Sequence, residues 1–440
     1  MADERNYNTR SVKKLEAGKL ASAYQKEWFK GLAPRVKAGE PFAIVSAYFP
    51  MEIFRAMDIP FVVSQWWSAI CAAKQMSGRY FENLRREGYR EDLCSYCGTV
   101  FAGSLDPEPE LGPWGGLPNP TLLIAESSCG SLRKIYELMG RKTGASIYCM
   151  ERTTCVYTAE KWWELAPYDW EKLYEPGRVD YIEKDLRNLI HFLETQTGRM
   201  LDENRLIEIM NIVNEQENYY KMTRDLIAET IPAPVSVTDT VNAVMQAQWQ
   251  RGTQWAADHA KFLYEEVKAR ADAGLPAIPN EKIRLMWIGI GLWSNLAFYQ
   301  HFEEKYGAVF VWTMYLAMAA DQYPRYNVEE NPLRALASRE IGMRDALHVY
   351  PMNADWYIHE AEHNHIDGIV YYNSPGGCAD SGVSDVQLVI QTLRNAGYPV
   401  LDFKANALNG RRWNQEEMIN IVETFIEGEV IPHQEKEGRR

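Results

Sequence analysis

The feature that most constrains the fold is a recurring order of short apolar run, turn and helical stretch. It appears in two separate parts of the chain. The first part has apolar runs at 42–47, 61–64, 121–125 and 145–149. The second part has them at 283–290, 308–312, 368–372 and 399–403, with helical patterns such as 383–395 and 415–426 between them. This order is typical of parallel sheets covered by helices, so we expect an α/β protein.

Between these two parts the pattern changes. Apolar residues recur on single helical faces, as Ile182, Leu186, Leu189 and Leu193 do, with no strand between them. Residues 9–38 also lack strand patterns and favour helix. We therefore divide the chain into a helical arm (1–40), a first α/β domain (41–175), a helical linking segment (176–278), a second α/β domain (279–431) and a tail (432–440).

The charge balance excludes several classes of partner. The 440 residues carry 47 basic and 60 acidic side chains, a formal net charge of -13. No basic face is evident for nucleic acid or an anionic membrane. The longest apolar run, 308–320, is shorter than the ~20 residues that span a bilayer. The amino-terminal residues lack the apolar stretch of a secretory signal and the cysteine count is odd, so we expect a cytoplasmic protein without nucleic acid or membrane as partners.

One short motif suggests zinc. His359, Glu360 and His363 satisfy H-E-x-x-H, in which two imidazoles on one helical face bind zinc and the glutamate is the general base. The segment lies directly before the predicted strand 368–372, so we expect it at the end of a crossover helix, away from the strand ends where α/β sites form. A solvated, histidine-rich helix end is the competing interpretation.

Three cysteines stand at positions where ligand sites form. Cys129 and Cys378 each follow a predicted strand and precede a helix, and Cys94 lies near the start of another helical segment. Thiolates at such places could surround one soft metal centre, although a single cysteine is more often core packing. We assign Cys71, Cys149 and Cys155 to the core. Cys97, three residues after Cys94, remains ambiguous.

At these residues the chain resembles the 2-hydroxyacyl-CoA dehydratase and benzoyl-CoA reductase family, most of all the larger, substrate-side subunit of ATP-dependent benzoyl-CoA reductases. The resemblance covers about residues 40–428. It rests on Asp-Leu-Cys94-Ser-Tyr, Ser-Ser-Cys129-Gly, the strand-end Cys378, the Pro50-Met-Glu52 turn, and the closing Gly397-Tyr-Pro-Val-Leu and Gly410-Arg-Arg-Trp-Asn-Gln-Glu-Glu segments.

The resemblance implies two flavodoxin-like, doubly wound domains and a [4Fe-4S] cluster held by Cys94, Cys129 and Cys378. It also implies a homologous second catalytic subunit, an ATP-hydrolysing iron–sulfur activator and ferredoxin as electron donor. The chain has no G-x-x-x-x-G-K-[ST] phosphate loop, which agrees with ATP hydrolysis in a separate activator.

Several other side chains are candidates for the reaction. Glu52, in the turn after the first strand, is the candidate proton relay, with a helix-start charge as the alternative. Tyr96 and Ser127 could donate hydrogen bonds to cluster or substrate. Trp66 and Trp67 could enclose an aromatic ring, although core packing explains them equally well.

Our sequence-based hypothesis is an iron–sulfur aryl-CoA reductase subunit that adds two electrons and two protons to a CoA-activated ring, giving a cyclic dienoyl-CoA. The near alternative is a 2-hydroxyacyl-CoA dehydratase subunit, in which one electron makes a ketyl radical and hydroxide leaves. A zinc hydrolase using His359 and His363, and a non-catalytic subunit, are the more distant alternatives.

Overall fold

The chain contains two parallel sheets, each of four strands, in a computed structural model that describes residues 7–91, 94–127, 129–153, 159–317, 323–374 and 385–438. The first sheet has the strand order β2-β1-β3-β4 and the second the order β6-β5-β7-β8. In both, the first strand in sequence lies between the second and third, so the second half repeats the topology of the first. The strands are β1 (Ala43–Val45), β2 (Phe61–Val63), β3 (Leu122–Glu126), β4 (Ser146–Met150), β5 (Ile283–Ile288), β6 (Ala308–Thr313), β7 (Gly368–Asn373) and β8 (Val400–Lys404).

The strands form where the sequence predicts them because a parallel strand covered on both faces is a continuous apolar run. All residues of β3, β5 and β6 are buried. The edge strand β4 is only partly covered, and Ile147 is 40% exposed there. This confirms the predicted α/β class with two doubly wound parallel sheets.

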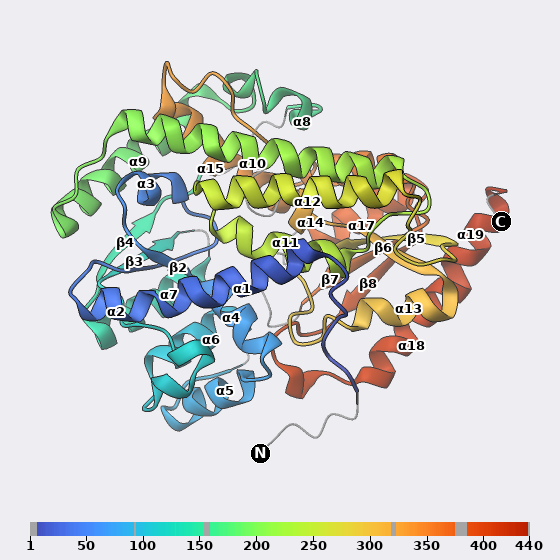
Figure 1. The fold of residues 1–440 in the computed structure, drawn as a ribbon, viewed down its shortest axis with the longest axis horizontal. Coiled ribbons are helices and arrows are strands. Elements are labelled where there is room, and N and C mark those ends of the chain that lie inside the picture. The colour runs from blue at the N-terminus through green and yellow to red at the C-terminus, as the bar shows by residue number, and fades with distance from the viewer. Residues whose placement is uncertain are drawn as a thin grey trace.

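Helices cover the sheets and connect them (Figure 1). The amino-terminal helices α1 and α2 precede the first sheet, and α1 packs against α11. In sequence, α3 to α8 fall between β1 and the helical segment, and α13 to α19 follow β5. The bounds are α1 (Glu16–Lys30), α2 (Leu32–Lys37), α3 (Met51–Ala56), α4 (Ser64–Ala73), α5 (Ser77–Arg86), α6 (Ser95–Ser104), α7 (Gly130–Thr143), α8 (Trp162–Leu165), α13 (Phe298–Tyr306), α14 (Met314–Ala317), α15 (Pro332–His348), α16 (Met352–His363), α17 (Val386–Asn395), α18 (Gln415–Phe425) and α19 (Ile431–Lys436).

Between the sheets the chain is helical: α9 (Pro176–Thr197), α10 (Glu203–Glu229), α11 (Val237–Trp249) and α12 (Gln254–Asp272). In Figure 1 the first sheet lies on the left and the second on the right, and the long pair α10 and α12 runs above both. The helices α10 and α12 pack against each other along their length. No helix among the described residues combines the length and apolar character needed to cross a bilayer.

Candidate active site

A cavity of about 80 Å³ opens where the carboxyl end of the first sheet faces the second half of the chain. Residues after β1 and β3, and from α4 and α6, line one side. Residues of α11 and of the segments after β5 and β6 line the other. Six aromatic side chains enclose the cavity: Tyr48, Trp66, Tyr96, Trp249, Trp293 and Tyr315. This position matches the rule that ligands bind beyond the carboxyl ends of parallel strands.

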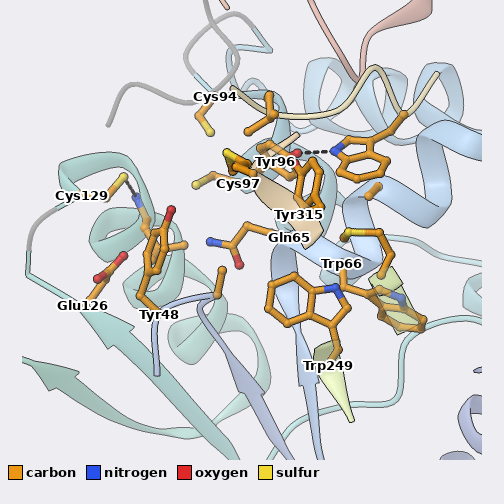
Figure 2. Close-up of a pocket in the computed structure, with 17 residues that line it drawn as sticks. Tyr48, Gln65, Trp66, Cys94, Tyr96, Cys97, Glu126, Cys129, Trp249 and Tyr315 are labelled. Carbon is orange, nitrogen blue, oxygen red and sulfur yellow. Dashed lines mark hydrogen bonds between the residues drawn. The ribbon is translucent and has the colours of Figure 1, made fainter. Parts of the chain in front are cut away.

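Three thiols meet in the wall of this cavity (Figure 2). Cys94 directly precedes α6, Cys97 lies in the first turn of that helix, and Cys129 directly precedes α7. The Sγ atom of Cys129 accepts a hydrogen bond from the backbone N–H of Leu132 at 3.3 Å. All three cysteines are buried. The structure therefore brings together two of the predicted metal ligands and a third thiol that the sequence left ambiguous.

Cys97 interacts with both of its neighbours. Hydrogen bonds to the thiols of Cys129 and Cys94, followed by burial, raise the pKa of Cys97 well above its usual value. The C-x-x-C spacing is the sequence signal for this placement, because it sets Cys97 almost one helical turn after Cys94. Within the described ranges, no group of three or more Cys, His, Asp or Glu side chains has the arrangement needed to hold a metal ion.

The remaining cysteines divide into two groups. Cys71 is fully buried, and burial raises the pKa of its thiol. Cys149 lies half-buried in β4, where burial also raises its thiol pKa. Neither lines the cavity. The burial of Cys71 agrees with the core assignment, whereas Cys149 is only partly covered on the edge strand. Cys155 and the predicted third ligand Cys378 lie outside the described residues.

A polar network borders the cavity beside the thiols. Glu126, the last residue of β3, accepts a hydrogen bond from Arg152 Nε at 2.9 Å, and Arg152 also donates to the backbone oxygen of Tyr48. The hydroxyl of Tyr48 lies 3.0 Å from His348 Nε2. Burial, followed by the neighbouring Arg344, lowers the pKa of His348 to about 3. Tyr48 is therefore hydrogen-bonded to a neutral imidazole at neutral pH.

Of the predicted substrate-binding residues, Trp66 and Tyr96 line the cavity, and Trp293 Nε1 donates to the Tyr96 hydroxyl. Trp67 does not line it, because it stacks on Phe29 with ring centroids 5.0 Å apart. Ser127 lies outside the lining, where its hydroxyl accepts from the backbone N–H of Arg152 at 3.1 Å. Sequence reasoning did not identify Gln65, whose amide points into the cavity in Figure 2.

Glu52 occupies a different environment from the one expected for a proton relay. It is fully buried and absent from the cavity lining. Its Oε1 atom lies 3.3 Å from Arg251 Nε and 3.3 Å from Arg339 Nη1. Burial alone would raise the pKa of Glu52, but the two guanidinium groups outweigh it and hold the pKa below its usual value. These contacts support a structural role, and the proton-relay role stays a prediction.

The H-E-x-x-H segment ends α16 just before β7, as predicted. The ring of His359 stacks on Trp163 at 4.7 Å, and His363 Nε2 lies 3.7 Å from Asp225 Oδ1. Glu360 is buried and accepts from Trp312 Nε1 at 2.7 Å. These partners leave the glutamate unsuited to serve as a general base. The zinc alternative therefore has no third donor within the part of the chain that the structure describes.

The family profile and the related proteins that match this chain point to the same family of enzymes. Residues 46–428 match the profile of the family described as 2-hydroxyglutaryl-CoA dehydratase, D-component. The chain is 24% identical to the (R)-2-hydroxyisocaproyl-CoA dehydratase alpha subunit of Clostridioides difficile over 407 residues, 91% of this chain and 92% of that protein. It is 25% identical to the (R)-phenyllactyl-CoA dehydratase alpha subunit of Clostridium sporogenes over 283 residues, 63% of this chain and 64% of that protein.

Proposed function

Because the chain belongs to the 2-hydroxyglutaryl-CoA dehydratase D-component family, we propose that it is a catalytic subunit of a 2-hydroxyacyl-CoA dehydratase. Both relatives named above are dehydratase alpha subunits, which favours the dehydratase alternative over the aryl-CoA reductase that the sequence first suggested. The observation that carries the proposal is the convergence of Cys94, Cys97 and Cys129 in one aromatic-walled cavity at the strand ends.

The donor set fits an iron–sulfur cluster better than a single hard ion. Cys94 and Cys129 are buried thiols from two different helix starts, and such thiols lose their protons when they bind a metal. Helix starts favour the thiolate form. We propose that Cys94, Cys129 and Cys378 hold a [4Fe-4S] cluster, with Cys97 beside it. When bound, such a cluster supplies single electrons and one iron open to the substrate.

The overall reaction is redox-neutral. The C2–hydroxyl bond and a C3–hydrogen bond of the acyl group break, a C2–C3 double bond forms, and the hydroxide and proton leave as water. This chain must therefore orient the acyl group and move a proton. The six aromatic side chains exclude water from the cavity. Tyr48, with its hydroxyl on neutral His348, and Glu126, held by Arg152, are the protonatable groups that we assign to proton handling.

The aromatic wall also favours a second candidate. Trp66, Trp249 and Trp293 could enclose a planar ring, as an aryl-CoA reductase would require. That reaction would add two electrons and two protons to the ring of an aryl-CoA. For either reaction we propose a homologous partner subunit and a separate ATP-hydrolysing iron–sulfur activator supplied by reduced ferredoxin.

A turnover assay separates the candidates. The chain, assembled anaerobically with its partner subunit and activator, is given phenyllactyl-CoA, 2-hydroxyisocaproyl-CoA or benzoyl-CoA. We expect an enoyl-CoA from a 2-hydroxyacyl thioester and no product from benzoyl-CoA. Dienoyl-CoA from benzoyl-CoA would support the second candidate, and no product from any thioester would contradict both.

A further inference from the structure

A second hollow, of about 530 Å³, adjoins the active-site cavity on the side of the amino-terminal arm. We call this hollow the basic groove, because four basic side chains line it: Arg10, Lys13, Lys26 and Lys74. Arg10 and Lys13 precede α1, Lys26 belongs to α1, and Lys74 follows α4. Two parts of the chain, the amino-terminal arm and the end of α4, therefore bring their cations to one place.

The charge of the groove is opposite to that of the chain. The whole protein has a net charge of -13, and about one residue in seven is acidic. Among the described residues that line the groove, none is acidic. A local cluster of one sign in a hollow raises the concentration of oppositely charged ligands there. The groove therefore favours an anion although the protein as a whole repels one.

These cations have no carboxylate close by. Within the described ranges, none of the four lies within 4.0 Å of an acidic oxygen, whereas lysines elsewhere, such as Lys221 with Asp225, form ion pairs. Lys13 Nζ donates to the hydroxyl of Ser22, and Lys74 Nζ lies 4.7 Å from the centre of the Trp114 ring. Partial burial, followed by repulsion from Arg10, lowers the pKa of Lys13 and of Lys74. An anion bound here would relieve that repulsion.

The basic groove adjoins the active-site cavity. Trp66, Ala69, Met245 and Trp293 line both hollows. The groove and the three thiols are separated by these shared side chains, so a ligand held in the groove that passes them would reach the thiols. Such a ligand needs an anionic end, a long uncharged arm and a reactive group at the far end.

We propose that the basic groove binds the phosphate-bearing nucleotide end of a coenzyme A thioester, while its acyl end occupies the thiol-lined cavity. This inference rests on the proposed acyl-CoA function and adds the place where the coenzyme is held. The phosphates contact Lys13, Lys26, Lys74 and Arg10, and Trp114 offers a flat face near Lys74. Phosphate recognition of this kind depends on salt.

The test is equilibrium binding of free coenzyme A to the full-length chain, which requires neither turnover nor activator. The variant is Lys26→Gln/Lys74→Gln, and the matched control is Lys261→Gln, an exposed lysine of α12 outside the groove. We expect the double variant to bind coenzyme A about tenfold more weakly, since each exposed ion contact contributes a few-fold. The control variant should bind coenzyme A with the affinity of the wild type. Pantetheine, which lacks the phosphates, should bind the wild type and the double variant with equal affinity.

Equal coenzyme A affinity of the double variant and the wild type would overturn the proposal. So would displacement of coenzyme A by an equal concentration of inorganic phosphate, which would reveal a general anion surface. The result is independent of the dehydratase assignment. If the enzyme dehydrates its substrate but the double variant binds coenzyme A as well as the wild type does, only the groove proposal is contradicted. If the double variant binds coenzyme A more weakly but no dehydration is observed, only the proposed reaction is contradicted.

Discussion

Replacing Glu52 by glutamine tests whether this residue holds the fold together or relays protons. Its carboxylate contacts Arg251 and Arg339 at 3.3 Å each, and all three side chains are completely buried. At that distance, with an effective dielectric constant of about 20, each attraction is roughly 5 kcal/mol before desolvation is subtracted. Removing one partner of a buried ion pair costs about 3–5 kcal/mol.

We therefore expect Glu52→Gln to lower the free energy of unfolding by about 3–5 kcal/mol in urea titrations, with an unchanged dependence on urea concentration. Glu265→Gln, an exposed glutamate of α12, is the control and should change stability by less than about 0.5 kcal/mol. A loss below about 1 kcal/mol, together with reduced turnover and a displaced pH profile, would refute this reasoning and favour the proton relay.

Three other changes probe the polar network, the buried Glu217 near Arg251 and Arg339, and the histidine motif. Tyr48→Phe removes the hydroxyl that lies 3.0 Å from His348, so we expect turnover to fall about a hundredfold while thioester affinity is kept; unchanged turnover would exclude Tyr48 from proton handling. Burial raises the pKa of Glu217 to about 7, so the folded protein favours the protonated carboxyl more than the unfolded chain does. The stability linked to this proton is fully present below about pH 4.5 and is lost as the pH rises through 7. Glu217→Gln should therefore have a higher free energy of unfolding than the wild type at pH 8, by up to about 3 kcal/mol, and this difference should shrink toward pH 5. A difference in unfolding free energy that does not change with pH would be inconsistent with this titration. His359→Ala removes the stack on Trp163 and should leave the metal content of the protein unchanged, whereas loss of stoichiometric zinc would revive the hydrolase alternative.

The sequence was most informative where chemistry and local structure coincide. The predicted strand 368–372 is β7 (Gly368–Asn373), because a parallel strand covered on both faces is a nearly continuous apolar run. The place of Cys129 in the site followed from the rule that sites form at the carboxyl ends of strands, because Cys129 follows β3. Cys94 follows a helix and precedes α6, and its expected place beside Cys129 came from the family resemblance.

Contacts between distant segments could not be predicted. Glu52 pairs with arginines about 200 and 290 residues away, and no local pattern encodes such a pairing. Trp66 and Trp67 are adjacent in α4, where successive side chains point about 100° apart, so only Trp66 reaches the cavity. Trp249 and Tyr315 enter it from elements that the sequence alone could not place beside the first sheet.

Metal analysis of anaerobically prepared protein tests the central claim most directly. We expect about four irons and four acid-labile sulfides per chain. Single replacement of Cys94, Cys129 or Cys378 by alanine should remove this iron, and Cys97→Ala, a matched thiol in the same cavity, should retain it. Wild-type protein that contains stoichiometric zinc and no iron, or full iron content in the Cys94 and Cys129 variants, would contradict the account.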